Sequence, residues 1–346
     1  MASAKKLPSG SWRVNLFIGK DENGKRKYKS FTAGTKKDAE FLAAQFNVDR
    51  KEQERCELTL RAATERYIES KRNVLSPMTI RGYETVLRCY MGDIMPLKVS
   101  DITQEALQLS VNAMAKRYAA KTCRNAHGLV TAVLAVYRPD FTPRTSLPKS
   151  KKRDIYVPDS EEVIGILKRV KGSANELPVF LAAECGLRAE EIAGLRLENV
   201  HPDHIDVKEA IVIDSDLNRV VKPPKSTSGY RSIPITEEAY KYILERSDTD
   251  DRVCNRSNEM VSNNWGRYRR EHPDISEHLN FHAFRHHYAS KLLLMGIPQK
   301  YIAELMGHGS TDMIEKVYQH IFPSAMEHYQ ELIRDSMQHE MQHTIE

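Results

Sequence analysis

Alternating apolar and polar positions open the chain and predict a small antiparallel sheet. Residues 12–18 alternate, and residues 26–31 alternate again after the turn-favouring pair Asn23-Gly24, which is the pattern of a β-hairpin. Thr35 has the side chain of a helix N-cap, and residues 39–46 continue with apolar positions at helical spacing. Residues 1–56 therefore predict a sheet followed by a helix.

A helical pattern occupies residues 57–138. Thr59, Ser76 and Thr103 are suitable N-caps, and Pro77 suits the first position of a helix. With a further run of helical spacing over residues 121–137, we expect a domain of four helices.

The chain then changes composition over residues 139–158. Four prolines and the basic run 149–153 disfavour helix and sheet alike, which predicts an interdomain linker. Residues 159–346 begin with helical patterns, contain strand-like stretches over 204–213 and 219–235, and end in helical patterns. The predicted fold class is multidomain and mainly α, with a small antiparallel sheet in the last domain.

Composition excludes several classes of protein. No apolar run reaches the roughly 18 to 20 residues of a membrane helix, and the first eight residues lack the apolar stretch of a secretory signal, so we expect a cytoplasmic protein and no membrane partner. The five cysteines form no CxxC pair, which indicates neither a disulfide framework nor a structural zinc site.

The charge is unevenly distributed and favours a polyanionic partner. Residues 1–150 carry 27 basic and 15 acidic side chains, whereas residues 151–346 carry 25 basic and 32 acidic ones. A basic front points to nucleic acid, and a strand pair fits a DNA major groove, although a solvated sheet face explains the hairpin residues nearly as well. The candidate DNA contacts are Arg13, Lys25, Arg26, Lys27, Lys29, Lys149, Lys151, Lys152 and Arg153.

Two pairs of residues in the last domain suit phosphate chemistry. Arg188 lies two residues after Gly186, a helix-stop glycine, and precedes Glu191 by three positions, so a helix would hold the guanidinium against the carboxylate. His282 and Arg285 share the same spacing. Each pair alone is unspecific.

Three single residues complete the candidate set. Lys225 lies between two strand-like runs, where a hairpin tip would carry its ammonium group into a neighbouring site. His308 lies between two glycines, and Tyr318 follows ten residues later. Taken separately, a solvated loop lysine and a half-buried core tyrosine explain Lys225 and Tyr318 equally well.

The order of these motifs along the chain resembles the tyrosine recombinase (phage integrase) family. The motifs are GLRxxE, a lysine before a strand, HxxR, GH and a tyrosine ten residues later. The resemblance covers nearly the whole chain and is greatest to integrases of prophages and integrative conjugative elements. Ala283-Phe284 within HxxR and Met306 before the glycine depart from the usual residues without removing a chemical group.

The resemblance implies a site-specific DNA recombinase that cleaves and rejoins DNA through a 3′-phosphotyrosyl intermediate. It implies Tyr318 as nucleophile, Lys225 as general acid and His282 as acid/base partner. Arg188, Arg285 and His308 would bind the phosphate oxygens, and Glu191 would hold Arg188. No metal, ATP or other cofactor is implied.

The resemblance also implies domains and partners. Residues 1–56 would bind arm-type DNA, residues 57–138 would bind core DNA, and residues 159–346 would form the catalytic domain with a C-terminal exchange helix. The implied partners are double-stranded DNA with core and arm-type sites, three further copies in a homotetramer on DNA, an excisionase and a host DNA-bending protein. Packing of the last helix within its own domain remains an alternative.

Three other functions fit parts of the sequence. Residues 339–343 match HExxH, the zinc-protease pattern, but only three residues follow for a further ligand. A non-catalytic DNA-binding regulator fits residues 284–306 as a helix-turn-helix but leaves the catalytic set unused. A type IB topoisomerase fits the site but not the basic N-terminal hairpin.

Overall fold

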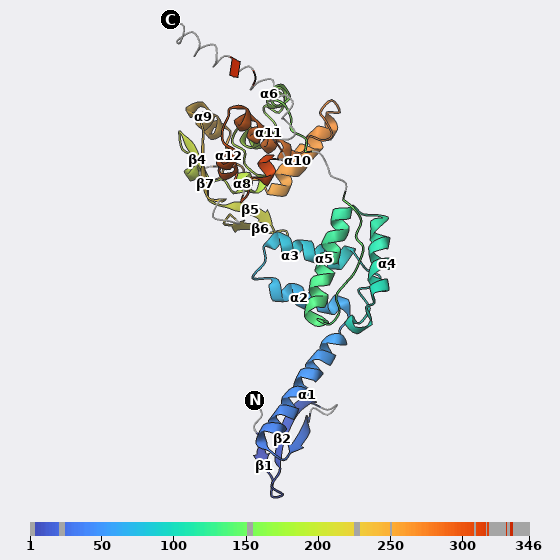
Figure 1. Cartoon of the computed structure of the whole chain (residues 1–346). Helices are drawn as coiled ribbons and strands as arrows, with labels where there is room; N and C mark the ends of the chain where they lie inside the picture. The colour runs from blue at the N-terminus through green and yellow to red at the C-terminus, as the bar shows by residue number, and fades with distance from the viewer. Residues whose placement is uncertain are drawn as a thin grey trace. The chain divides into compact units, whose positions relative to one another are not determined.

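The computed structural model describes residues 4–20, 25–150, 155–224, 229–249, 251–307, 309–315, 317, 330 and 333–334. The chain divides into two compact units, Met1–Ser150 and Lys151–Glu346 (Figure 1). In the part of the chain that the structure describes, no helix combines the length and the apolar character that crossing a membrane requires.

An antiparallel sheet with one helix begins the first unit, as the sequence predicts. Strands β1 (Lys5–Lys6), β2 (Trp12–Lys20) and β3 (Arg26–Ala33) lie in that order in the sheet, and helix α1 (Lys36–Cys56) packs along it (Figure 1). Thr35 caps the helix, because its Oγ1 accepts the N–H of Asp38 at 3.2 Å. The predicted Asn23-Gly24 turn lies outside the described residues.

The two faces of this sheet differ in chemistry. Val14 is fully buried against α1, and the register places Arg13 opposite Thr32 and Phe17 opposite Tyr28 on the other, open face. Arg26 shares the open face with Tyr28 by strand alternation. Lys29 faces α1 instead, with its Nζ 3.9 Å from the Phe46 ring centroid. The candidate DNA contacts of the hairpin are therefore divided between two faces.

The four helices expected between residues 57 and 138 are present in the described residues. Three of them are capped as predicted, because the hydroxyls of Thr59, Ser76 and Thr103 each accept a backbone N–H three residues later. Their apolar faces share one core around Leu60, Leu107 and Leu129. The elements are α2 (Leu60–Lys71), α3 (Pro77–Cys89), the 3₁₀ turn η1 (Val99–Asp101), α4 (Gln104–Ala115) and α5 (Ala120–Tyr137).

Part of the expected linker is attached to this helical bundle. The Gln104 amide donates to the carbonyl of Thr142 at 2.8 Å, and its oxygen accepts the N–H of Arg144 at 2.8 Å. Gln108 binds the backbone of Ser146 in the same way. Residues 142–146 are thus fixed along α4, and the division between the two units falls after Ser150.

The second unit is mainly helical around one core. Trp265 and Phe284 lie at its centre with their rings 4.8 Å apart, and the Trp265 indole donates to the carbonyl of Leu279. Its elements are α6 (Ser160–Arg169), α7 (Glu176–Glu184), α8 (Ala189–Gly194), η2 (Leu197–Asn199), β4 (His204–Val207), β5 (Ala210–Ile213), β6 (Arg219–Lys222), β7 (Arg231–Pro234), α9 (Glu237–Arg246), α10 (Asn258–Glu271), α11 (Phe281–Leu294) and α12 (Gln299–Leu305).

In the described residues, the strands of this unit form two antiparallel pairs. β5 pairs with β6, and β4 pairs with β7. The β5–β6 turn is held by Asp214, whose Oδ1 accepts the N–H groups of Asp216 and Asn218 at 2.9 and 2.8 Å. The segment between β6 and β7 therefore links two separate strand pairs, and the possible hairpin tip at Lys225 lies outside the described residues.

Helix α11 is a core helix. Its residues Phe281, Ala283 to Ser290 and Leu293 are buried, which leaves little of its surface for a DNA groove. The helix-turn-helix alternative for residues 284–306 is therefore disfavoured.

Candidate active site

A left-handed glycine positions the start of α8. Helix α7 ends at Glu184, and Gly186 has φ +63°, a conformation that L side chains rarely adopt. A Cβ at Gly186 would also lie 2.4 Å from the Tyr288 ring of α11. The tight turn therefore requires glycine, and it places Arg188 at the N-cap of α8.

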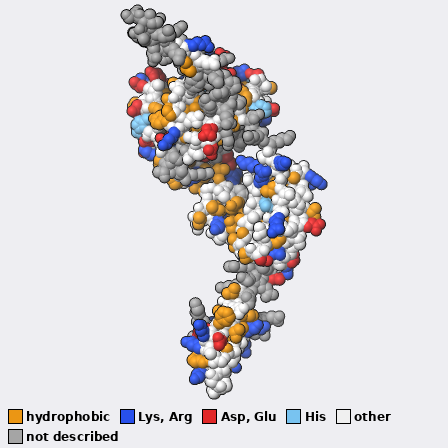
Figure 2. Space-filling model, viewed as in Figure 1, with side chains coloured by type: hydrophobic (Ala, Val, Ile, Leu, Met, Phe, Trp, Pro, Cys, Tyr) orange, Lys and Arg blue, Asp and Glu red, His pale blue; other side chains and the backbone are white. Residues whose placement is uncertain are grey.

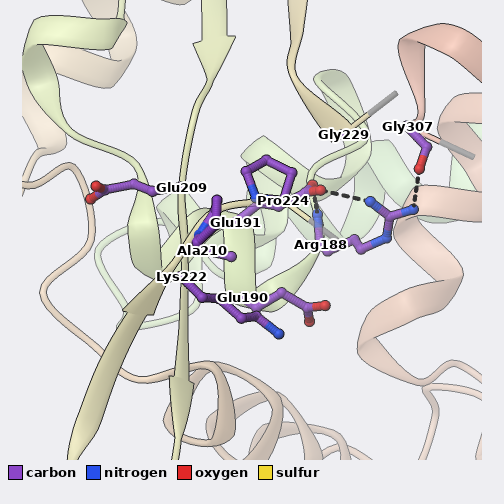
Figure 3. Close-up of a pocket in the computed structure, with 10 residues that line it drawn as sticks. Arg188, Glu190, Glu191, Glu209, Ala210, Lys222, Pro224, Gly229 and Gly307 are labelled. Atoms are coloured by element: carbon purple, nitrogen blue, oxygen red, sulfur yellow. Dashed lines mark hydrogen bonds and ion pairs between the residues drawn. The ribbon is translucent and has the colours of Figure 1, made fainter. Parts of the chain in front are cut away.

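Glu191 holds Arg188 through both its side chain and its backbone. Arg188 Nη1 lies 2.6 Å from Glu191 Oε1, and the Arg188 backbone N–H donates to Oε2 at 2.9 Å. Arg188 Nη2 donates to the carbonyl of Gly307 at 3.0 Å (Figure 3). The i, i+3 spacing predicted this pair, and the contact with Gly307 joins α8 to the chain that follows α12.

Arg231 of β7 is a second arginine on the same carboxylate, and sequence reasoning missed it. Its Nη1 and Nη2 donate to Glu191 Oε1 and Oε2 at 3.0 and 2.8 Å, which is a bidentate pair. Its Nε donates to the carbonyl of Leu305 at 2.6 Å, and its side chain is only 5% exposed. The only available indication was its place six residues after Lys225, at the start of a strand-like run.

Arg285 of α11 is the third arginine at this carboxylate. Its Nη1 lies 3.7 Å from Glu191 Oε2, and its guanidinium donates to the carbonyls of Gly186 and Met306. The residue is 1% exposed. In this arrangement Arg285 lies beneath the surface of the site, while Arg188, with 23% of its side chain exposed, forms part of that surface.

The charges of this cluster are strongly coupled. Burial by itself raises the pKa of Glu191, but the hydrogen bonds and charges of Arg231, with the charges of Arg285 and Arg188, lower it to about 2. Burial and the charge of Arg188 lower the pKa of Arg285 well below its usual value. Three guanidiniums around one carboxylate leave an excess of positive charge, which favours an anion beside Arg188.

His282 lies one turn before Arg285 on α11 and is exposed. Its ring contacts His286, with centroids 4.8 Å apart and planes at 89°. Burial and the charge of Arg285 lower the pKa of His286 to about 4, so His286 is neutral near pH 7. His282 is thus the solvent-facing histidine of this helix end, as a proton carrier requires.

A pocket of about 290 Å³ opens in front of Arg188. Figure 3 shows Arg188 on one side and the side chain of Lys222 reaching toward Glu190 on the other. Pro224, Gly229 and Gly307 also line this pocket. Arg188 is the part of the arginine cluster that an entering anion meets first.

Three predicted catalytic residues, Lys225, His308 and Tyr318, lie outside the described residues. Their sequence neighbours do bear on the site: Pro224 precedes Lys225, and Gly307 precedes His308, and both line the pocket. Val317, which precedes Tyr318, is fully buried in the core. Among the candidate DNA contacts, Lys151, Lys152 and Arg153 lie outside the described residues, and Lys149 is exposed.

Known proteins that are similar to this chain include recombinases and transposases. Residues 159–324 match the phage integrase family. A XerC-like tyrosine recombinase of Caldanaerobacter subterraneus is 24% identical over 94% of this chain and 96% of its own. The transposase of transposon Tn916 from Enterococcus faecalis is 24% identical over 78% of this chain and 77% of its own.

Solved structures share the fold. The Tn1549 transposon integrase in complex with a circular intermediate DNA aligns with a TM-score of 0.64 at 17% identity, over 80% of this chain and 99% of that chain. A lambda integrase tetramer bound to a Holliday junction aligns with a TM-score of 0.59 at 16% identity, over 91% of this chain and 94% of that chain.

Proposed function

The chain belongs to the tyrosine recombinase family, and from this premise we propose that it integrates or excises a mobile element by cleaving and rejoining DNA at specific sites. The observation that carries the proposal is the cluster of Arg188, Arg231 and Arg285 on Glu191 beside an open pocket. Planar guanidinium groups are suited to phosphate oxygens, and their preorganised charge stabilises a pentacoordinate transition state.

In the proposed reaction, the Tyr318 oxygen attacks the scissile phosphorus and forms a 3′-phosphotyrosyl bond. The bond from phosphorus to the 5′-oxygen breaks, and Lys225 gives this oxygen a proton, so that a 5′-hydroxyl leaves. His282 takes the proton of the tyrosine hydroxyl. Attack by a 5′-hydroxyl from another duplex reverses these steps and joins new strands.

The arginines take different parts in this proposal. Arg188 contacts a non-bridging oxygen directly, because it is the partly exposed guanidinium that lines the pocket. Arg285 reaches the phosphate after its buried guanidinium exchanges the carbonyls of Gly186 and Met306 for phosphate oxygens. His308 adds a hydrogen bond to the phosphate. Glu191 keeps Arg188 in place and exchanges no proton, since its pKa is about 2.

In the proposal, the first unit makes the DNA contacts that lie outside the catalytic site. In the proposal, residues 1–56 bind arm-type sites through the open face of the sheet, and residues 57–138 bind the core site. A hollow of about 640 Å³ between α3 and α5 supports the second assignment, because hydrogen-bonding side chains suited to base edges and phosphates line it: Thr79, Tyr83, Thr122, Arg124 and Asn125. Residues 139–158 connect this part to the catalytic domain.

The assembly is proposed by analogy with the relatives. The active form is a homotetramer on DNA, in which the segment after Tyr318 is exchanged between copies, and an excisionase and a host DNA-bending protein control direction. The protein acts at the nucleoid of a bacterial cytoplasm.

Replacing Tyr318 with Phe tests the nucleophile. With a nicked suicide duplex that carries the element's end sequence, we expect the covalent protein–DNA adduct to disappear while DNA binding persists, because only the attacking oxygen is removed. Tyr301→Phe is the matched control, since Tyr301 lies on α12 with 53% exposure, and it should retain the adduct. An adduct that survives in Tyr318→Phe assigns the reaction to another nucleophile. Joining of the cleaved strand to a second duplex distinguishes recombination from topoisomerase activity.

A further inference from the structure

A tight turn before β4 gathers two histidines and an aspartate away from the arginine cluster. The N–H of His201 donates to the carbonyl of His204 at 2.8 Å, and Val200 bridges to Ile205. The two-residue loop between the histidines stacks their rings with centroids 4.4 Å apart. Asp206 follows His204 by two positions, so it shares the same face of β4.

The side chains present their ligand atoms to one point. His204 Nε2 lies 3.7 Å from Asp206 Oδ1, and His201 Nε2 lies 3.9 Å from Asp206 Oδ2. One ligand atom from each residue lies within 4.8 Å of the other two. Ligands of a tetrahedral zinc ion, at about 2.0 to 2.2 Å from the metal, stand roughly 3.3 Å apart, so small side-chain adjustments close the site.

A neighbouring carboxylate orients one ligand. Asp203 Oδ1 lies 2.7 Å from His204 Nδ1, and this contact leaves Nε2 to face Asp206. Metal-binding histidines are held by such carboxylates through the nitrogen that does not bind the metal. The side chains of His201, His204 and Asp206 are 37%, 35% and 21% exposed, so an ion from solvent reaches them.

The ammonium group of Lys208 contacts the aspartate of this cluster. Its Nζ lies 3.0 Å from Asp206 Oδ2 and 3.0 Å from Asn199 Oδ1. A metal ion would displace the ammonium group from Asp206, and Asn199 would remain as its acceptor. Ser232 of β7 donates to Asp206 Oδ1, which connects the cluster to the neighbouring strand.

We propose that His201, His204 and Asp206 bind one divalent cation of borderline softness, with Zn²⁺ as the representative and water as the fourth ligand. Two imidazoles with one carboxylate favour Zn²⁺ over Mg²⁺ and Ca²⁺, which prefer oxygen ligands. The ion holds the turn that carries His201 against strand β4. Because Ser232 of β7 donates to Asp206, the ion also connects this turn to β7. The site is separate from the DNA chemistry and does not depend on the proposed function.

Calorimetric titration of the full chain with Zn²⁺ tests the site. The background carries His339→Ala and His343→Ala, because the sequence contains a second histidine pair there. We expect one ion to bind per chain, and His201→Ala or His204→Ala to abolish binding. Asp203→Asn should weaken binding about tenfold, since it removes only the orienting carboxylate. His278→Ala is the control, because His278 is exposed beside Glu277, and it should bind as the background does.

A variant that binds Zn²⁺ more tightly than the parent is needed as well, because loss of binding in a variant can also result from misfolding. Lys208→Ala removes the ammonium group that competes for Asp206, so we expect it to bind Zn²⁺ several-fold more tightly. Zn²⁺ should also raise the melting temperature of the background protein, reversibly with a chelator, and leave that of His204→Ala unchanged. Absence of Zn²⁺ binding, binding that His201→Ala retains, or binding that Lys208→Ala does not tighten overturns the proposal.

Discussion

Glu191 shows how a single buried carboxylate places several cations. It contacts Arg188, Arg231 and Arg285 and is 7% exposed. Without this charge, the guanidiniums would repel one another in a poorly solvated region, where such repulsion is strong. With it, the cluster keeps an excess positive charge at a fixed position, where the proposed function places the scissile phosphate.

The ionisation of Glu191 makes this arrangement sensitive to acid. Its pKa of about 2 is below the ordinary value of 4.5, so the folded state favours the carboxylate. The stabilisation from the ionised carboxylate is fully present above the pKa that Glu191 has in the unfolded chain. It is lost as the pH falls through the pKa that Glu191 has in the folded protein. We expect Glu191→Gln to lower the free energy of unfolding by about 3 kcal/mol near neutral pH, because a buried ion pair loses one partner.

Urea denaturation at a series of pH values measures this effect. The difference between the parent protein and Glu191→Gln should narrow between about pH 5 and pH 2, where the parent loses its advantage. Glu190→Gln, at the rim of the pocket, serves as the control and should change stability little. A difference that stays constant with pH would show that the ionised carboxylate is not the origin of the stability.

Among the elements, the turn between α7 and α8 determines where the site forms. Gly186 combines φ +63° with a Cβ position 2.4 Å from Tyr288, and its carbonyl accepts from Arg285. The turn therefore joins α8 to α11 through backbone and side-chain contacts at once. Any side chain at this position displaces either the ring or the turn.

Substituting alanine at two different glycines separates two contributions to the loss of stability. One is the strain of a positive φ, and the other is the clash of a new Cβ with its neighbours. Gly172 has φ +76° with nothing within 4 Å of its Cβ position, so Gly172→Ala should cost about 1 kcal/mol of stability. Gly186→Ala should cost several kcal/mol, since it adds a clash in a packed core, and it should reduce DNA cleavage. Thermal denaturation of both variants measures the difference. Equal losses of stability would contradict the clash with Tyr288.

The helices could be predicted from the sequence because their signals are local. A hydroxyl side chain before an apolar run marks a helix start, and Thr35, Thr59, Ser76 and Thr103 all cap helices in the structure. Strand pairing is not local, because alternation gives the faces of a strand and not its partner. The sequence therefore identified the strand-like segments but not that β6 pairs with β5 and β7 with β4.

The site was predictable only in part for a similar reason. The i, i+3 spacing of Arg188 and Glu191 indicates their contact directly. Arg231 gives no such indication, since its carboxylate partner is 40 residues away in the chain and an arginine at a strand start usually faces solvent. The burial of Arg285 is likewise decided by the packing of α11 against α7 and not by its own neighbours.

At the scale of the whole molecule, the two units differ in the sign of their net charge. The first unit carries the basic excess, and Figure 2 shows Lys and Arg side chains on the visible face of its sheet and of its helical part. The second unit is acidic overall, yet its arginine cluster keeps a local positive charge. If the first unit binds DNA through phosphates, as proposed, this binding releases counterions and depends steeply on salt, whereas the arginine cluster would contact a single phosphate.

The two faces of the N-terminal sheet allow the proposed phosphate contacts of the first unit to be tested on the full chain. Arg13 and Arg26 lie on the open face, whereas Lys29 faces α1 with its ammonium group over Phe46. If the open face binds phosphates, Arg13→Ala with Arg26→Ala should reduce the slope of log affinity against log salt by about 2, because each neutralised phosphate contributes about 0.9 to that slope. Lys29→Ala is the matched control, because it removes a positive charge from the other face and should leave the slope nearly unchanged. Fluorescence anisotropy with a mixed-sequence duplex measures both slopes, and equal slopes for the two variants would mean that the open face is not the surface that meets DNA.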